Sequence, residues 1–241
     1  AGTNADDSEW IGHDQNTWNY VGFHPHEETS WGCNDSDATN YDPDSDGCED
    51  GTTDCCNYPV IPTEMSIQDI QGQADASPHV DVLVSTSGVV TGATSSGFWI
   101  QNGEGDWSGI WCYDGAGAVS IGDDVTVVGT VIEYYDLTEV MVDEIAINSS
   151  GNAAPAPVAL QTGVFEEAYE SVVVSATGEC DSAPNDYGEW TINDGTGPGM
   201  VAAKMYAYSA MIGNSYAVAG PLDFSYSNFK IQPRDENDVV E

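Results

Sequence analysis

The stretch IGDDVTVVG, residues 121 to 129, aligns position for position with IGNSYAVAG, residues 212 to 220. Two further pairs of segments share this spacing: GFWIQNG (97–103) with EWTINDG (189–195), and YYDLTEV (134–140) with SYSNFKI (225–231). The offset is 91 or 92 residues in all three pairs. This agreement indicates a tandem duplication of a domain of roughly 80 to 90 residues, a period too long for a solenoid repeat.

Each copy reads as a set of short strands. From about residue 60 onward, β-branched runs alternate with glycine-containing turns, and convincing helix patterns are scarce. Gly88 and Gly178 lie inside the first long strand of each copy, where a β-bulge would let the strand bend around a small barrel. We therefore predict an all-β fold with two tandem OB-fold-like small barrels, preceded by an N-terminal irregular arm and a disulfide-stapled acidic module.

Several segments also resemble a known group of domains. EEAYESVVVSATG and IGNSYAVAGPLDFSYSNFKIQPRD in the second copy, and GVVTGATSSGFWIQNG in the first, resemble OB-fold domains that accompany secreted bacterial nucleases and other exported bacterial proteins. The resemblance covers about residues 80 to 241. It implies the OB fold and an accessory role, because those domains serve beside a catalytic domain that this sequence lacks.

The chain divides into five expected parts. They are an aromatic arm (1–32), a Cys-rich acidic calcium-binding module (33–58), a first OB-fold-like domain (59–150), a linker (151–162) and a second OB-fold-like domain (163–241). The arm shows no sustained helical or strand period and cannot build a core of its own. We expect either the rest of the chain or a neighbouring copy to hold it.

The charge of the chain is strongly one-sided. Against three Lys and Arg residues stand 41 Asp and Glu residues, which gives a formal net charge of −38. Such a surface repels phosphates and anionic lipids and repels itself unless cations bind, although solvation in high salt would explain the bulk charge equally well. Nucleic-acid binding is disfavoured, because the only basic residues are Lys204, Lys230 and Arg234, all in the second copy. We also expect no membrane span, because no run of about 18 apolar residues occurs.

The cysteines indicate an oxidising compartment. An even number of cysteines without a C-x-x-C motif is typical of disulfides, so we expect an extracellular or cell-surface location. The neighbours Cys55 and Cys56 are poorly placed to pair with each other, because a disulfide needs two facing Cβ atoms. Fifteen pairings remain open for six cysteines. The predicted disulfide residues are Cys33, Cys48, Cys55, Cys56, Cys112 and Cys180.

The segment YDPDSDGCED, residues 41 to 50, has the spacing of a calcium loop. Carboxylates at alternate positions can curl around one hard cation, and Gly47 permits a sharp turn. A true EF-hand is disfavoured because its twelfth position holds Thr53 in place of Glu, so a shorter loop fits better. A solvated acidic loop is the alternative, and Asp35 with Asp37 would form a second site. The predicted calcium ligands are Asp42, Asp44, Asp46, Asp50 and Asp54.

The wider segment GCNDSDATNYDPDSDGCEDGTTDC resembles a cysteine-bounded acidic repeat of exported bacterial proteins. The resemblance implies that Cys33 pairs with Cys55, and Cys48 is an addition to that pattern. In the arm, His24 and His26, with His13 nearby, form a loose set for zinc or copper. A polar loop is the preferred interpretation of these histidines.

The sequence contains none of the common catalytic motifs. The sequence contains no G-x-S-x-G, H-E-x-x-H or phosphate-binding loop, and neither barrel contains a histidine. The strand aromatics could form a base-stacking face, but alternation along the strands favours packing in or on the barrels. These aromatics are Phe98, Trp99, Trp111, Tyr113 and Trp190. We predict that the chain is not an enzyme.

The leading functional hypothesis is a secreted structural protein that calcium and disulfides stabilise. It would assemble with copies of itself into an extracellular filament or surface layer, because an arm that packs on the next subunit creates a head-to-tail contact. The alternative is an accessory nucleic-acid- or polysaccharide-binding module of a secreted hydrolase, and a sugar-binding adhesin is a weaker option. Candidate partner contacts are Trp10, Trp18, Trp31 and Trp107.

Overall fold

The structure, a computed structural model, describes residues 30–113 and 119–241. The chain forms two compact units that divide between Val60 and Ile61. The predictions made for Trp10, Trp18 and the three arm histidines lie outside the described residues. No helix in the described part is long and apolar enough to cross a membrane.

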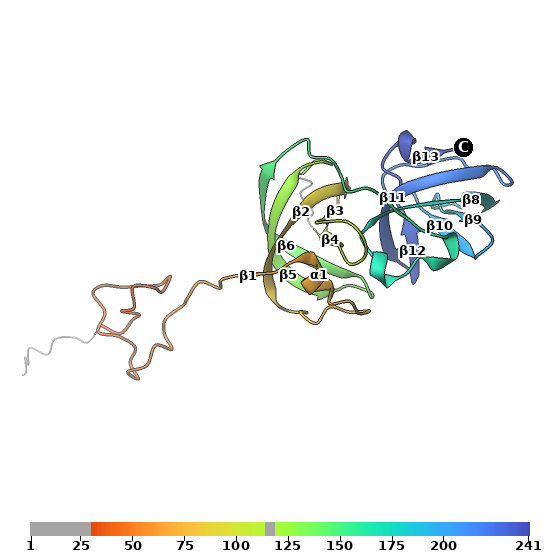
Figure 1. The fold of residues 1–241 in the computed structure, drawn as a ribbon. Helices are drawn as coiled ribbons and strands as arrows, with labels where there is room; N and C mark the ends of the chain where they lie inside the picture. The colour runs from red at the N-terminus through yellow and green to blue at the C-terminus, as the bar shows by residue number, and fades with distance from the viewer. Residues whose placement is uncertain (1–29, 114–118) are drawn as a thin grey trace, which may run out of the picture. The chain divides into compact units, whose positions relative to one another are not determined.

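The second unit begins with a closed five-stranded barrel (Figure 1). Its strands are β2 (Leu83–Ala93), β3 (Gly97–Gln101), β4 (Gly109–Tyr113), β5 (Asp124–Glu133) and β6 (Thr138–Ser149). They lie in the order β2-β3-β4-β6-β5, and β5 pairs back onto β2 to close the barrel. The β4–β6 pair is parallel and the other neighbours are antiparallel.

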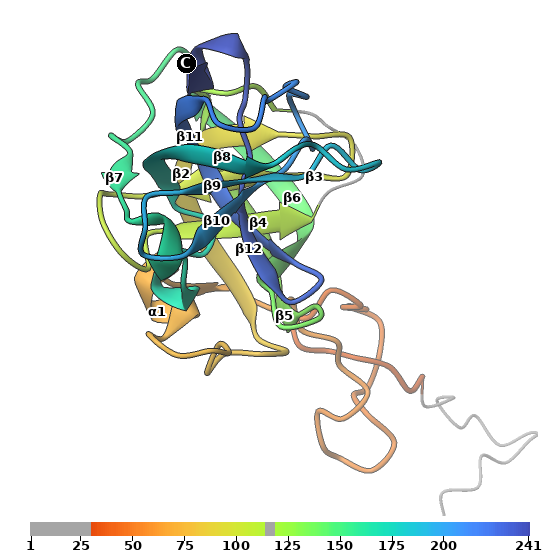
Figure 2. The ribbon, with the colours of Figure 1, turned by 90° about the vertical axis from the view of Figure 1, so that its right-hand side faces the viewer.

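A second closed barrel follows with the same order and the same single parallel pair, and Figure 2 shows it facing the viewer. Its strands are β8 (Val173–Ser182), β9 (Trp190–Asn193), β10 (Pro198–Val201), β11 (Ser215–Ser225) and β12 (Asn228–Ile231). The parallel pair is β10 with β12, and β11 pairs with β8 to close the barrel. The predicted fold class, all-β with two tandem small barrels, is confirmed.

Short elements complete the second unit. The strands β1 (Thr63–Glu64), β7 (Val158–Ala159) and β13 (Val239–Val240) pair at barrel edges. The helices are α1 (Ile67–Gln71) and the 3-10 turns η2 (Thr162–Val164), η3 (Glu167–Tyr169) and η4 (Glu236–Asp238). Helix α1 begins where the Ser66 side chain accepts a hydrogen bond from Asp69 N–H and ends at Gly72, which has a φ of 68°. The stretch predicted as a linker, 151–162, therefore carries β7 and the first residue of η2.

The register shows the duplication residue by residue. Gly88 pairs with Val125 in the first barrel, and Gly178 pairs with Tyr216 in the second. Val125 and Tyr216 are 91 positions apart, which is the offset between the repeated segments. Alternate residues of β2 and β5 are buried, as a strand with one face on a barrel core requires.

The predicted bulges at Gly88 and Gly178 are displaced along the strand. The register shifts lie between Val90 and Gly92 in the first barrel and between Cys180 and Ser182 in the second. The two glycines serve another purpose, because a Cβ atom on Gly88 would lie 2.9 Å from Gln101 O and one on Gly178 would lie 2.7 Å from Asn193 N. Glycine here allows the neighbouring strand to approach closely.

The first unit has almost no regular structure in the part described, residues 30–60. One isolated bridge joins Cys33 to Tyr41. Its buried hydrophobic residues are Cys33, Ala38 and Cys48. A segment with so small a core depends on covalent cross-links for its fold.

Candidate functional site

Two disulfides hold the acidic module. Cys33 bonds to Cys56 with an S–S distance of 2.07 Å, and Cys48 bonds to Cys55 at 2.05 Å. The expectation that Cys55 and Cys56 join different partners is confirmed. The pairing of Cys33 with Cys55, which the resemblance implied, is wrong, because the additional Cys48 takes Cys55 as its partner.

The prediction that all six cysteines form disulfides is also wrong. Cys112 is buried in the core of the first barrel and Cys180 in the core of the second, so they lie in different hydrophobic clusters. Neither belongs to the two disulfides of the module. Both residues are fully buried and pack as small hydrophobic side chains.

Reduction of the two disulfides is expected to unfold the acidic module while leaving the barrels folded. A cross-link that closes a loop of about 15 residues contributes about 3 kcal/mol, and few buried contacts would remain to replace it. Hydrogen exchange read by mass spectrometry should show loss of protection over residues 30–60. The melting temperature of the barrels, followed by circular dichroism, should not change. Retained protection of the module after full reduction would contradict this expectation.

The carboxylates predicted to bind calcium fold back onto their own backbone. Asp42 accepts a hydrogen bond from Asp44 N–H at 3.0 Å, and Asp46 accepts one from Ser30 N–H at 2.9 Å. Asp50 accepts from the hydroxyl and the N–H of Thr52, and these bonds lower its pKa. The contacts of Asp42 and Asp50, each with an N–H two residues further along the chain, are typical of Asx turns.

These carboxylates do not converge in the structure. Within the described residues, the one group of three or more acidic, histidine or cysteine side chains with ligand atoms inside 4.8 Å of one another is Cys48, Cys55 and Cys56. All three of these cysteines are in disulfides. Asp42, Asp44, Asp46, Asp50 and Asp54 are thus brought into one loop but not around one point, and calcium binding there stays a prediction.

The two barrels of the second unit contact each other through hydrogen bonds and buried side chains. Gln101 Oε1 accepts a hydrogen bond from Val173 N–H at 2.9 Å, and the backbone N–H of Trp107 donates to Ala168 O at 2.7 Å. The first pair joins β3 to β8, and the second joins the β3–β4 loop to η3. We call this region the barrel junction.

Aromatic and aliphatic side chains fill one side of the barrel junction. The ring centroids of Trp99 and Trp111 are 4.4 Å apart, and Leu137 packs with them in one buried cluster. Met205 and Phe224 of the second barrel pack against that cluster. The predicted packing role of the aromatics thus holds for Phe98, Trp99, Trp111 and Trp190, which are all buried, whereas Tyr113 is 48% exposed.

An ion pair whose carboxylate is buried lies beside this apolar region. Lys204 Nζ lies 2.7 Å from Asp223 Oδ1, and Asp223 is completely buried. The same ammonium group lies 5.7 and 5.5 Å from the ring centroids of Trp99 and Trp111. Lys204 therefore joins a carboxylate of the second barrel to the aromatic rings of the first.

Three glutamates are partly or fully enclosed on the other side of the junction. Thr138 N–H donates to Glu170 Oε1 at 3.2 Å, and Thr138 Oγ1 donates to Glu133 Oε1 at 2.7 Å. Ser77 N–H also donates to Glu133 Oε1, at 2.7 Å. The remaining oxygens, Glu133 Oε2, Glu167 Oε1 and Glu170 Oε2, are buried without a hydrogen-bond partner within the described residues.

Burial changes the acidity of this group. Burial raises the pKa of Glu167 to about 7, and the negative charges of Asp75, Glu133 and Asp136 add to the rise. Burial raises the pKa of Glu170 well above its usual value, and Glu167 contributes. We call Glu133, Glu167 and Glu170 the junction acids.

Sequence reasoning missed the junction acids. In a chain with 41 carboxylates no residue type singles them out, and they come from segments 34 or more positions apart. Trp107, a candidate partner contact by sequence, is half-buried with a φ of 58° at the barrel junction, and its contact with a partner stays a prediction. Trp31 is 52% exposed in the module and remains open to a partner.

The first barrel also has a polar hollow of about 310 Å³. Its lining residues are Glu64, Met65, Ser66, Ser85, Thr86, Ser87, Asn102 and Thr126. This set offers hydroxyl and amide groups and one carboxylate, with no basic side chain. Its chemistry suits a neutral polar molecule better than an anion.

No family model matches the chain, and no curated protein matches it.

Proposed function

We propose that the chain is a non-enzymatic, secreted structural protein that calcium and disulfides stabilise and that assembles with copies of itself into an extracellular filament or surface layer. The two disulfides of the module support a location outside the cytoplasm, because such bonds persist in oxidising compartments. The extensive barrel junction supports a rigid building block. We further propose that the barrels are related to OB-fold domains of exported bacterial proteins, in keeping with their strand order.

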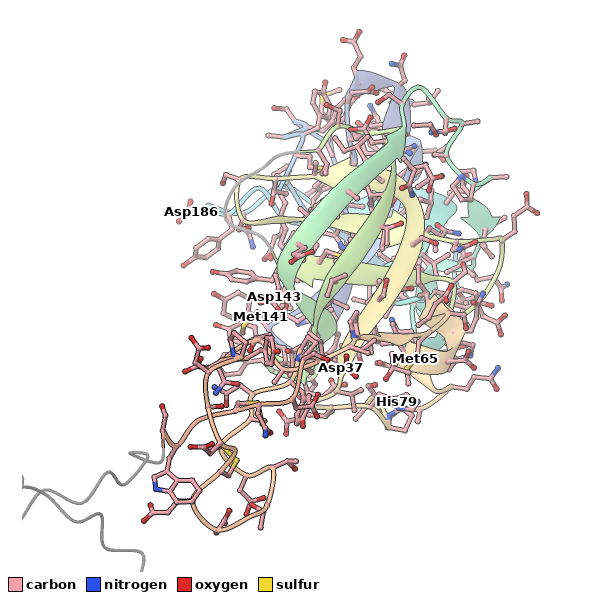
Figure 3. All side chains as sticks on the ribbon, turned by 90° about the vertical axis from the view of Figure 1, so that its left-hand side faces the viewer. Asp37, Met65, His79, Met141, Asp143 and Asp186 are labelled. Atoms are coloured by element: carbon pink, nitrogen blue, oxygen red, sulfur yellow. A yellow bond between two sulfur atoms is a disulfide. The ribbon has the colours of Figure 1, made fainter. Side chains whose placement is uncertain are left out.

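An open strand edge carries the proposal of self-assembly. β6 pairs with β5 along most of its length, whereas β4 covers its other edge only at Glu139, Val140 and Met141. No strand of the described residues pairs with that edge from Val142 to Ser149. Figure 3 shows Met141 and Asp143 on this strand. An open edge of this length can accept a strand from another chain.

The occupant we propose for this edge is the first part of the arm, residues 1–29, of a second copy. The arm has aromatic residues and no core of its own by sequence, and the edge offers exposed apolar side chains at Met141 and Ile147. The edge is acidic because Asp143 and Glu144 lie along it, and the arm contains acidic residues as well. Assembly through this contact should therefore require cations that screen the repulsion.

Deletion of residues 1–29 is expected to convert a calcium-dependent polymer into single chains, and Ile147→Lys should do the same by placing a charge on the edge. Light scattering and electron microscopy measure the size. Ile121→Lys is the matched control, because Ile121 is 48% exposed and Ile147 is 50% exposed, but Ile121 lies in a turn. Polymers of unchanged size in both test variants would refute the proposal.

A second candidate function is an accessory polysaccharide-binding module. Tyr135 and Tyr226 occupy equivalent places in the two copies, are 80% and 91% exposed, and have φ values of 52° and 53°. Exposed aromatic rings and the polar hollow both suit sugars. Binding of a neutral polysaccharide by single chains at physiological salt would favour this candidate over assembly. Nucleic acid is not proposed, because all three basic side chains are paired with carboxylates.

A further inference from the structure

The junction acids are brought together by four separate segments. Glu133 ends β5, and its Oε1 accepts from Thr138 at the start of β6 and from Ser77 in the loop after α1. Glu167 and Glu170 belong to η3 and the residue that follows it. The site thus combines groups from the first barrel with groups from the segment that leads into the second barrel.

The unpartnered oxygens make this cluster different from an exposed acidic patch. Glu170 is 1% exposed, and its Oε2 atom has no hydrogen-bond partner in the described residues. Glu133 Oε2 and Glu167 Oε1 are in the same condition. A buried carboxylate oxygen without a partner loses its hydration and gains nothing in exchange, which is costly.

No lysine or arginine side chain is left to neutralise these groups. The chain contains three Lys and Arg residues in total. Lys204 pairs with Asp223, Lys230 with Glu189, and Arg234 with Asp238. None of these three side chains is therefore available to the junction acids, and protons or a metal ion from solution can supply the positive charge there.

We propose that the barrel junction holds a calcium ion, bound by the carboxylates of Glu133, Glu167 and Glu170. Carboxylate oxygens are hard ligands, which favour Ca²⁺ or Mg²⁺ over transition metals. Calcium accepts irregular sets of ligands that include water, whereas magnesium demands near-octahedral geometry at short distances. Three carboxylates from two segments, Glu133 on one and Glu167 with Glu170 on the other, therefore suit calcium better.

Ion binding requires a small closure of the site. The oxygens of the junction acids are not all within 4.8 Å of one another, so the side chains must rotate inward to share one ion. The Oε1 atoms of Glu133 and Glu170 are held by Thr138, which leaves the two Oε2 atoms to turn toward the ion. Because the ligands come from both sides of the junction, the ion would fasten the two barrels to each other.

The test measures melting of the full chain by near-ultraviolet circular dichroism, in chelator and then in calcium. Calcium at about 100 times its Kd should raise the melting temperature of the barrels by about 5 to 10 °C. Glu170→Gln should remove most of this rise and weaken calcium binding, measured by calorimetry, at least about tenfold. The amide keeps the acceptor for Thr138 N–H and removes a buried charge, so this variant should melt higher than the wild type in chelator.

Two controls separate this site from other acidic groups. Glu166→Gln changes an exposed carboxylate beside the junction acids and should keep the full calcium response. Asp44→Asn with Asp46→Asn tests the module and should leave the response of the barrels unchanged. An equal calcium response in wild type and Glu170→Gln, or no response in the wild type at pH 8, would overturn the proposal.

This inference shares with the proposed function only the choice of ion. Assembly is measured by particle size, and the junction site by melting of the barrels and by calorimetry. A chain that fails to polymerise but shows the Glu170-dependent calcium response would disprove assembly and support the site. A chain that polymerises but lacks that response would support assembly and disprove the junction site.

Discussion

Gly220→Ala is expected to lower the free energy of unfolding of the second barrel by about 3 kcal/mol. Gly220 lies in β11 with a φ of 151°, a conformation that residues with a side chain rarely adopt. An added Cβ atom would also lie far inside contact distance of Gln232 O and 3.1 Å from Pro233 N. Both obstacles are backbone atoms of the segment that directly follows β12. They can move only if that backbone shifts, which costs free energy.

The duplication provides controls that separate the two causes. Gly129 is the equivalent residue of the first barrel and faces the backbone oxygen of Met141, but its φ is not in the left-handed region. Gly213 has a φ of 91° with nothing within 4 Å of an added Cβ. Gly129→Ala therefore measures the clash, and Gly213→Ala measures the backbone cost of about 1 kcal/mol.

Urea unfolding followed by tryptophan fluorescence gives the three values. The loss of unfolding free energy should be larger for Gly220→Ala than for either control, because this variant combines the steric clash with the backbone cost. Equal losses of unfolding free energy for Gly220→Ala and Gly213→Ala would show that the backbone near Gln232 shifts easily. The close approach at Gly220 would then not constrain the residue.

The strands could be predicted well from the sequence because each strand pattern occurs twice, once in each copy of the duplicated domain. The segments 121–129 and 212–220 lead into β5 and β11, which pair in the same register in the two barrels. The last residue of each segment is a glycine, Gly129 or Gly220. The position of the bulge was not predictable from Gly88 and Gly178, because a glycine that relieves a close strand contact looks the same in sequence as one that forms a bulge. Only the pairing in three dimensions separates these cases.

The candidate sites were harder to predict than the fold. The even number of cysteines suggested that Cys112 and Cys180 take part in disulfides, but a cysteine buried as a small hydrophobic residue in a strand has no sequence feature that distinguishes it. The alternate aspartates of the module were visible as a motif, yet their hydrogen bonds to nearby N–H groups turn them away from a common centre. The junction acids matter because they are buried, and burial of single carboxylates is invisible in so acidic a composition.

Lys204→Met is expected to destabilise the pair of barrels by about 2 to 4 kcal/mol at pH 8. Removal of one partner of a buried ion pair typically costs about 3 to 5 kcal/mol, and we reduce this figure because the Lys204 side chain is 40% exposed. Methionine keeps an apolar stem beside Trp99 and Trp111, so the loss reports mainly on charge. Asp223 would remain fully buried, and among the described residues Ser225 Oγ at 3.2 Å and Gln232 Nε2 at 3.3 Å would be its side-chain hydrogen-bond donors.

Lys230→Met is the matched control for this variant. Lys230 Nζ lies 2.6 Å from Glu189 Oε1, but the Glu189 side chain is 23% exposed and water can hydrate it after the lysine is lost. We therefore expect a smaller loss for Lys230→Met. The double variant Lys204→Met with Asp223→Asn should lose less than the sum of the two single variants, because the asparagine leaves no buried charge behind.

The loss from Lys204→Met should also depend on pH. Burial raises the pKa of Glu139 to about 7, and Lys204 opposes that rise, so Glu139 in the variant would ionise at still higher pH. A carboxyl whose folded pKa is raised contributes stability that is fully present below its unfolded pKa and is lost as pH rises through the folded value. The difference between variant and wild type should therefore be smaller at pH 5 than at pH 8. A loss that is independent of pH, or equal to that of Lys230→Met, would mean that Lys204 acts through packing and that the buried carboxylates do not depend on its charge.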